Sequence, residues 1–193
     1  MLNKTTILIV GLGNPGSEHE NTRHNVGFAV VDAFGEKYQI VGKQDDNLLC
    51  WYGKGENVIL AWPTTFMNKS GEAVLKLINW YKLNINDLIV VHDDVSLNPG
   101  RIKVAFGRGA AGHHGAESII QTLGGTEEFT RLRIGIGPDP GGDKRADYVL
   151  KEFTVDEDKL VKRIIDISIE ALETIITKGV GEAMNKFNGI EVT

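Results

Sequence analysis

The most constraining feature of the chain is a short apolar run that ends in a glycine-rich turn. Ile7 to Val10 is typical of a buried strand, because polar residues precede it and Gly11 follows it. The turn, Gly11–Gly16, holds three glycines and a proline, which adopt backbone angles that other residues avoid. An amphipathic segment, Val26–Tyr38, then predicts a helix. Because α/β proteins place binding and catalytic groups where a strand passes through a glycine loop into a helix, the polar stretch Asn21–Asn25 is the first candidate site.

The same alternation of strands and helices continues along the chain. The predicted strands after the first are Leu48–Lys54, Val58–Trp62, Leu88–Val91, Arg101–Phe106 and Leu132–Ile136. The predicted later helices are Ser70–Tyr81, Ala116–Leu123, Asp156–Thr177 and Glu182–Phe187. We find no repeat, linker or low-complexity segment, and 193 residues suit one compact domain. The sequence therefore predicts a single α/β domain over residues 1–193, with a central mixed twisted sheet and helices on both faces.

Composition excludes several classes of protein. The net charge of −5 argues against a wholly basic nucleic-acid-binding protein, although a local basic patch can still recognise a polyanion. The single cysteine, Cys50, excludes an internal disulfide and a multi-cysteine metal site. No apolar run approaches the roughly 20 residues of a membrane helix, and the first residues do not have the pattern of a signal peptide. We expect a cytoplasmic protein.

The glycines of the first loop match a dinucleotide-binding pattern, Gly11-x-Gly13-x-x-Gly16. Pro15 and the polar residues after it delay the helix, so no helix N-terminus meets the third glycine to receive a pyrophosphate. The acidic residue that should end a second strand is also missing, because Asp32 lies within the predicted helix. We therefore expect no nicotinamide cofactor, and no other cofactor is indicated.

His24 and Asp93 are the leading catalytic candidates. His24 follows the loop at the carboxyl end of the first strand, and Asp93 follows another predicted buried strand that can reach the same crevice. A carboxylate bonded to one imidazole nitrogen leaves the other nitrogen free to take a proton from water. The chain lacks a Gly-x-Ser-x-Gly elbow, and Cys50 falls in a predicted strand, so direct attack by water is favoured over a covalent nucleophile. The alternative is a histidine that only packs or caps the start of the helix.

Two other groups of residues have open interpretations. Phe66 and Asn68 share a loop, where an aromatic ring and an amide either stack and hydrogen-bond a substrate or belong to core and turn. A metal-dependent hydrolase remains a minority alternative, carried by His92–Asp94 with His113 and His114, although the spacing fits no common metal motif. We expect no metal.

Basic residues gather on or beside two predicted strands and the glycine loop that holds Gly112–Gly115. They are Arg101, Lys103, Arg108, Arg131 and Arg133. Such a cluster is either a solvated sheet edge or a site for a terminal phosphate.

Taken together, these loops resemble the bacterial peptidyl-tRNA hydrolase family. The matching stretches are Val10–Gly16, Thr22–Asn25, Pro63–Asn68, His92–Asp94, Gly112 and His113 with Gly115, and Arg131–Gly137. They occur in the family's order and span nearly the whole chain. The resemblance implies a monomeric, metal-independent esterase that cleaves the bond between a peptide and the terminal ribose of tRNA, and so recycles tRNA from stalled translation.

The resemblance also implies a role for individual residues. His24 would be the base that activates water, Asp93 would stabilise its basic form, and Asn14 would distinguish N-blocked from free aminoacyl esters. The peptidyl-adenosine end would be held by Phe66 and Asn68. The phosphate of tRNA would be bound by Arg133, with help from Lys103 and Arg108.

Four positions depart from the family's pattern. His114 stands where an asparagine usually helps to hold the water and the substrate end, and His19 replaces a tyrosine at the same end. Ser96 replaces an aspartate, and Ala105 replaces a lysine that commonly binds phosphate. These changes keep a rival function open, in which the same fold binds tRNA or another RNA with little or no hydrolysis.

Overall fold

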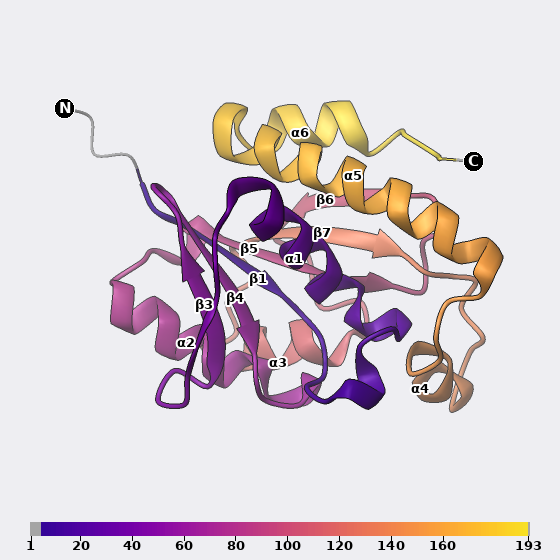
Figure 1. The fold of residues 1–193 in the computed structure, drawn as a ribbon, viewed down its shortest axis with the longest axis horizontal. Helices are drawn as coiled ribbons and strands as arrows, with labels where there is room; N and C mark the ends of the chain where they lie inside the picture. Colours follow the sequence, from indigo (N-terminus) through magenta and orange to yellow (C-terminus); the bar gives the residue numbers. More distant parts are fainter. Residues whose placement is uncertain (1–4, 193) are drawn as a thin grey trace.

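A seven-stranded sheet forms the centre of the molecule (Figure 1). The computed structural model describes residues 5–192. The strand order is β2-β3-β4-β1-β5-β7-β6. The strands are β1 (Ile7–Gly11), β2 (Lys43–Asp45), β3 (Cys50–Lys54), β4 (Val58–Pro63), β5 (Leu88–Asp94), β6 (Ile102–Phe106) and β7 (Thr130–Gly135). The four central strands are parallel, whereas β2, β3 and β6 pair antiparallel, which confirms the predicted mixed sheet.

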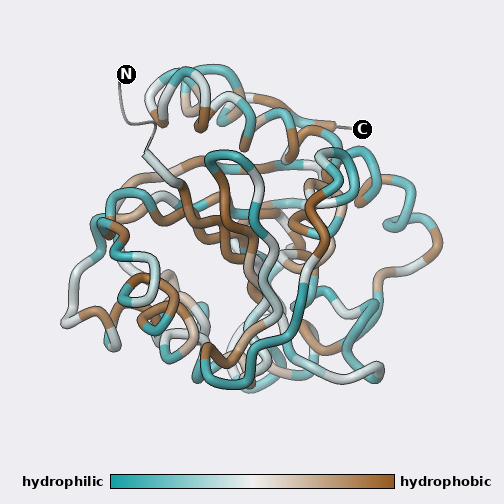
Figure 2. The backbone as a smooth tube through the Cα atoms, turned by 60° about the vertical axis from the view of Figure 1, so that its left-hand side comes forward, coloured by the Kyte–Doolittle hydropathy of each residue, from teal (hydrophilic) through white to brown (hydrophobic). Residues whose placement is uncertain are grey.

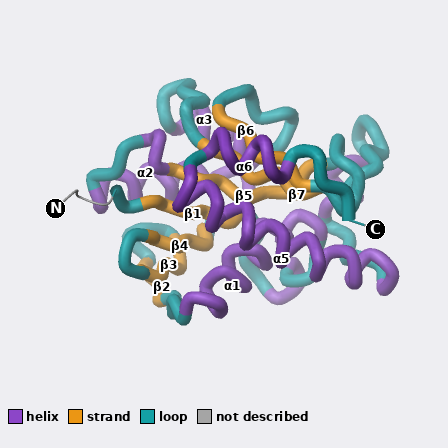
Figure 3. The backbone as a smooth tube through the Cα atoms, turned by 90° about the horizontal axis from the view of Figure 1, so that it is seen from above, coloured by secondary structure: helices purple, strands orange, loops and turns teal. Residues whose placement is uncertain are grey.

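Helices cover both faces of the sheet, as predicted. They are α1 (Val26–Tyr38), α2 (Ser70–Tyr81), α3 (His114–Thr122), α4 (Lys144–Val149), α5 (Val155–Lys178) and α6 (Val180–Phe187). One buried apolar cluster joins the sheet to α1, α5 and α6, and a second joins the opposite face to α2 and α3. Figure 2 shows the hydrophobic central strands, and Figure 3 shows them running between the α2–α3 side and the α1–α5 side. The parallel strands of such a sheet are buried on both faces and place their carboxyl ends along one edge.

Strand β5 is longer than the sequence predicted. The predicted end at Val91 is wrong, because the strand continues through Asp94, and all seven of its residues are buried. The added residues pair in parallel with β7: His92 lies opposite Arg133 and Asp93 opposite Ile134. Polar side chains concealed this continuation, since buried strands are normally apolar. As a consequence, Asp93 projects from a hydrogen-bonded strand rather than from a loop.

Two elements were not predicted. Strand β2 is a short, mostly exposed edge strand of polar residues, which carries no apolar alternation. Helix α4 follows the predicted turn, Pro138–Asp143, and buries only Val149, so it shows no amphipathic stripe. Both elements depend on tertiary contacts rather than on local pattern.

The start of α1 is pressed against the sheet at two glycines. A Cβ atom on Gly27 would lie 2.3 Å from the Val91 carbonyl oxygen and 2.6 Å from that of Leu12. A Cβ atom on Gly11 would lie 2.5 Å from the Gly27 carbonyl oxygen. Only glycine permits this approach, and it brings the residues just before α1 beside the carboxyl ends of β1 and β5.

Between residues 5 and 192, the structure contains no helix that is both long enough and apolar enough to cross a membrane.

Candidate active site

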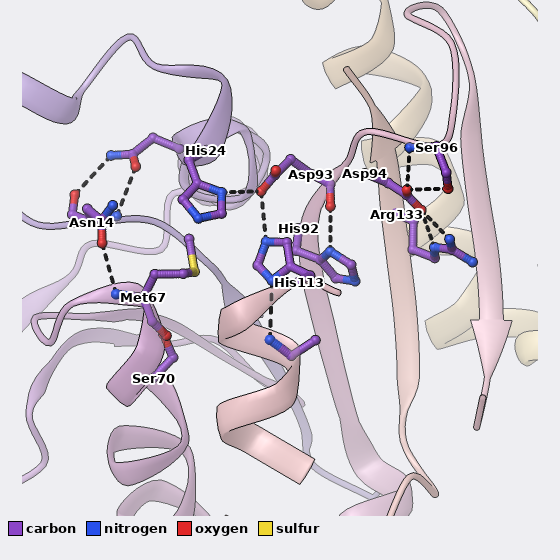
Figure 4. A network of polar contacts seen from close by, with 12 residues as sticks. Asn14, His24, Met67, Ser70, His92, Asp93, Asp94, Ser96, His113 and Arg133 are labelled. Atoms are coloured by element: carbon purple, nitrogen blue, oxygen red, sulfur yellow. Dashed lines mark hydrogen bonds and ion pairs between the residues drawn. The ribbon is translucent and has the colours of Figure 1, made fainter. Parts of the chain in front are cut away.

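His24 lies in a 3₁₀ turn, Arg23–Asn25, immediately before α1. Its Nδ1 is 2.8 Å from Oδ1 of Asp93, and both side chains are buried (Figure 4). A carboxylate oxygen can only accept, so Nδ1–H donates and Nε2 keeps its lone pair. No described residue hydrogen-bonds Nε2. The structure thus brings together the two residues that the sequence paired, with one nitrogen of His24 left available.

His113 shares the same carboxylate oxygen, although its sequence pattern indicated only a candidate metal ligand and a part of a family motif. Its Nε2 is 2.8 Å from Oδ1 of Asp93, and its Nδ1 accepts the backbone N–H of Ala116 at 3.2 Å. Because Nδ1 is an acceptor, the proton must sit on Nε2. His113 is also the N-cap residue of α3. Its place between Gly112 and the start of a helix was a usable sequence signal for this cap, whereas the predicted role of His114 came from the family resemblance alone.

The surroundings of Asp93 keep it ionised. Burial by itself would raise the pKa of Asp93, but the charges and hydrogen bonds of His24 and His113 outweigh burial and hold this pKa well below its usual range. A permanent negative charge here stabilises any positive charge that develops on the imidazole of His24.

A third histidine, His92, packs behind this pair. Its Nδ1–H donates to the backbone carbonyl of Asp93 at 2.6 Å, and its ring centre lies 4.4 Å from that of His113. Its Nε2 is buried and has no hydrogen-bond partner among the described residues. Burial, followed by the effect of His113, lowers the pKa of His92 well below its ordinary value. His92 is therefore a neutral packing residue rather than a base.

The same three side chains form the one group from residues 5 to 192 whose ligand atoms lie close enough to hold a metal ion. His24, Asp93 and His113 each offer one atom, and these atoms lie within 4.8 Å of one another. Two nitrogens and one oxygen are a ligand set that zinc accepts. In the present arrangement both nitrogens are occupied as donors to Asp93. A metal would have to displace both of these hydrogen bonds.

A cleft of about 510 Å³ opens at these residues. Its lining includes His24, Asp93, His113 and His114 on one side and Arg145 and Val149 of α4 on the other. It is large enough for a small part of a substrate, and His24 is positioned to act on a bond held there.

Asn14 is fixed by two neighbouring loops. Its Oδ1 accepts the backbone N–H of Met67 at 2.8 Å, and its backbone pairs with the side-chain amide of Asn25 at 2.8 and 3.0 Å. Because Oδ1 is used as an acceptor, the free group of the side chain is the Nδ2 donor. Figure 4 shows Asn14 beside His24.

The other predicted substrate residues lie outside the hydrogen-bonded group, and of the four only His114 lines the cleft. Phe66 is 62% exposed, and Asn68 is exposed in the following 3₁₀ turn. His114 begins α3 as an exposed side chain, 3.9 Å from Glu117. His19 is half-buried in the turn Ser17–His19, and its nearest charged partner is Glu18 at 3.9 Å.

The predicted phosphate residues have different surroundings. Arg133 forms an ion pair with Asp94 and is largely covered, and Lys103 lies directly across the β6–β7 pair from it. Arg108 is exposed. These three residues keep positive charge beside the glycine loop, although that of Arg133 is partly neutralised.

The inclusion of Arg131 in the basic cluster was wrong. Its side chain is 1% exposed, and its guanidinium donates to the carbonyl groups of Gly107 and Gly109. Desolvation and the neighbouring Arg133 lower its pKa. Arg131 supports the glycine loop from beneath and is not accessible to a phosphate. A linear sequence cannot separate it from Arg133, which also lies on β7.

Arg23 connects the His24 turn to the chain around α4. Its guanidinium donates to the carbonyl of Glu152 at 2.6 Å and to the carboxylate of Glu157 at 2.7 Å. It also lies 4.7 Å from the Tyr148 ring centre and 5.3 Å from that of Phe153. These contacts hold the α4 wall of the cleft against the turn that carries the candidate base.

Comparison with known proteins identifies the family of the chain. A family model described as peptidyl-tRNA hydrolase matches residues 8–193. The peptidyl-tRNA hydrolase of Clostridium perfringens is 42% identical over 189 residues, covering 96% of this chain and 99% of the relative. That of Clostridium acetobutylicum is 42% identical over 190 residues, with the same coverage. The crystal structure of the Acinetobacter baumannii peptidyl-tRNA hydrolase superposes with a TM-score of 0.92 at 34% identity, covering 97% of both chains. The chain therefore belongs to the peptidyl-tRNA hydrolase family and is a hydrolase.

Proposed function

We propose that this protein hydrolyses the ester bond between a peptide and the terminal ribose of tRNA, working as a single-domain monomer without a metal. The observation that carries the mechanism is the contact between His24 Nδ1 and Asp93 Oδ1 at 2.8 Å, which leaves Nε2 available in the cleft. Family membership supports the overall reaction.

In the proposed first step, Nε2 of His24 takes a proton from a water molecule whose oxygen attacks the ester carbonyl carbon. The carbonyl π electrons move to its oxygen, and a tetrahedral oxyanion forms. Asp93 stabilises the imidazolium through the Nδ1–H bond. When the intermediate collapses, the ribose oxygen leaves and takes the proton from His24. The products are a free carboxyl group on the peptide and a free hydroxyl group on the tRNA.

Asn14 supplies selectivity in this proposal. Its Oδ1 accepts the backbone N–H of Met67, which fixes the amide so that Nδ2 is the group left to donate to a substrate. A peptidyl ester, or an N-acetylated aminoacyl ester, has an amide carbonyl that Nδ2 can bond, and an unblocked aminoacyl ester has a charged amine there. The Nδ2 donor can hydrogen-bond the amide carbonyl, but it cannot accept a hydrogen bond from the charged amine, so the N-blocked ester is favoured.

The tRNA end is held by exposed residues. Phe66 offers an open ring for stacking the terminal base, His114 offers a hydrogen-bonding group at the cleft, and Asn68 offers an exposed amide in the turn after Phe66. Lys103, Arg108 and Arg133 would contact the phosphates. Arg133 must share its charge between Asp94 and the phosphate, so we assign the larger part of the salt-dependent affinity to Lys103 and Arg108.

The test is hydrolysis of N-acetylated and unblocked aminoacyl-tRNA by the wild-type protein and by His24→Ala, each with and without a chelator. We expect chelator-resistant release from the N-acetylated substrate only, and its loss in the variant. Loss of activity with chelator would replace the free-imidazole mechanism with a metal-bound one. Tight tRNA binding without release would show that the chain is an RNA-binding protein on this fold.

A further inference from the structure

A second cavity, of about 740 Å³, lies beside the loop that carries Asn14, between α1 and strands β3 and β4. We propose that this cavity receives the peptide arm of the substrate and favours residues with apolar or positively charged side chains. The inference rests on the proposed function and extends it to the choice of peptide.

The cavity has an apolar wall built from two indoles. Trp51 and Trp62 are direct partners in the antiparallel β3–β4 pair, so their side chains lie on the same face of the sheet. A Cβ atom on Gly42 would lie 3.4 Å from the Trp62 ring and 3.9 Å from the Trp51 ring, which places Gly42 over both of them. Trp51 is 46% exposed, and Val41 beside it is 85% exposed. This much exposed apolar surface in a hollow is typical of a binding site rather than of a solvated edge.

The charged residues of the lining all have the same sign. They are Glu20, Asp32 and Glu36, and the lining contains no lysine or arginine. Asp32 and Glu36 are one helical turn apart on α1, so their carboxyl groups lie near each other in the lining. Negative charge of this kind attracts a cationic side chain or a terminal amine and repels the phosphates of RNA.

The cavity lies next to the candidate active site, on the other side of the His24 turn. Asn14 and Asn25 line the cavity and are hydrogen-bonded to each other, and Asn25 directly follows His24, which lines the active-site cleft. The ring of Phe28, also in the lining, packs on Gly13, where an added Cβ atom would lie 2.7 Å from it. In this proposal, the peptide leaves the His24 cleft past Asn14 and then enters this cavity.

The ester of the substrate joins a tRNA arm to a peptide arm, and the surfaces on the two sides of the candidate active site carry opposite charge. Lys103, Arg108 and Arg133 lie on the side of the glycine loop, which suits the polyanionic tRNA arm. The acidic, tryptophan-lined cavity lies on the side of Asn14, which suits the peptide arm. Three residues beyond the ester-linked one span about 10 Å when extended, enough to leave the cleft.

The experiment compares three substrates that differ only in the acyl part. They are N-acetylglycyl-tRNA, which ends at Asn14 and is too short to reach the tryptophans and acidic residues, and tRNAs that carry Met-Lys-Leu-Gly or Met-Glu-Leu-Gly through the carboxyl-terminal glycine. With the wild-type protein we expect the lysine peptide to have the lowest KM and the glutamate peptide a higher one, with similar kcat.

Two variants then test the cavity directly. Gly42→Leu fills the cavity without changing its charge. The backbone can accept this side chain, because the added Cβ atom has ordinary contact distances. Asp32→Asn combined with Glu36→Gln removes two negative charges. We expect Gly42→Leu to raise KM for both peptides but not for N-acetylglycyl-tRNA. We expect the double variant to raise KM for the lysine peptide alone, by about threefold to tenfold, the factor that two partly screened charge pairs supply.

A matched control removes the same charge far from the cavity, by combining Asp166→Asn on α5 with Glu182→Gln on α6, and should leave all three KM values unchanged. Equal effects on all three substrates, or no effect of peptide charge, would overturn the inference. If Gly42→Leu does not fold, the double variant still decides the matter. Failure of the wild-type protein to cleave even N-acetylglycyl-tRNA would instead refute the proposed function, so the two failures are distinguishable.

Discussion

His24 and His113 donate to the same atom, Oδ1 of Asp93, each at 2.8 Å, but the second ring nitrogen of each has different surroundings. Nδ1 of His113 accepts the backbone N–H of Ala116, whereas Nε2 of His24 has no hydrogen-bond partner among the described residues. Two histidines on one carboxylate are thus not equivalent. His113 orients the carboxylate, and His24 is the one that can exchange a proton with water.

This difference predicts unequal effects of substitution. We expect His24→Ala to lower kcat by about 10²- to 10⁴-fold, the usual contribution of a general base. His113→Ala should cost only about tenfold, because it removes a positioning bond, and His113→Gln should recover part of the loss since its amide can still donate to Asp93. Single-turnover release from N-acetylated aminoacyl-tRNA measures all three. A loss in His113→Ala as large as that in His24→Ala would contradict the assignment.

The low pKa of Asp93 predicts a pH-dependent contribution to stability. A carboxyl group whose folded pKa is depressed stabilises the protein above its unfolded value of about 3.9, and this stability disappears as the pH falls through the lower folded value. Asp93→Asn should therefore lower the free energy of unfolding by about 2–3 kcal/mol at pH 7. The difference from wild type should shrink below about pH 4. Urea titrations at several pH values test this, and a difference independent of pH would mean that Asp93 is not ionised in the native state.

His92 should also make stability depend on pH, in a higher pH range than Asp93 does. Its folded pKa is depressed, so below the unfolded value of about 6.5 the unfolded chain binds a proton that the folded protein does not. Stability should then fall with decreasing pH by up to about 1.4 kcal/mol per pH unit from this residue alone. His92→Asn should flatten that slope between pH 7 and pH 5. Ser168→Ala, which removes a buried hydroxyl bonded to Ile164, is the control that lowers stability without changing the slope.

Arg23 should be important for both stability and the cleft wall. Arg23→Met removes the guanidinium that donates to the Glu157 carboxylate and to the carbonyl groups of Lys151 and Glu152, and we expect a loss of about 2–4 kcal/mol in the free energy of unfolding. Adding Glu157→Gln should cost less in this background than in wild type, because the two residues interact directly. Lys162→Met, which breaks only an exposed pair with Asp158, should cost less than about 1 kcal/mol. Additive effects of Arg23 and Glu157 in thermal or urea unfolding would count against the ion pair.

The basic residues beside the glycine loop should control the salt dependence of tRNA binding. Removing one phosphate contact reduces the slope of log affinity against log salt by about 0.7–0.9. We expect that reduction for Lys103→Gln and a smaller one for Arg133→Gln, since Asp94 already neutralises part of the Arg133 charge. Lys186→Gln on α6, where Lys186 faces Glu170, is the control. Equal slopes in Lys103→Gln and wild type would remove Lys103 from the tRNA-binding surface.

The sequence by itself determined the elements that have strong local signals. The bounds of α1 and α2 follow from their apolar periodicity, and the strand that ends at Gly11 follows from an apolar run and a glycine loop. Since parallel strands end at the same sheet edge, His24 and Asp93 were also predicted to meet, and the structure brings them within 2.8 Å.

Tertiary structure alone decided the rest. Asp93 belongs to β5 because it pairs with β7, a contact between residues 41 positions apart in the sequence (Asp93 and Ile134). His113 rather than His114 reaches the carboxylate because α3 begins at the second of these adjacent histidines, turning one side chain inward and leaving the other exposed. Arg131 and Arg133 differ in the same way, one buried beneath the glycine loop and one at its edge. Local propensity depends on near neighbours, whereas burial and hydrogen-bond partners depend on segments that only the folded chain brings together.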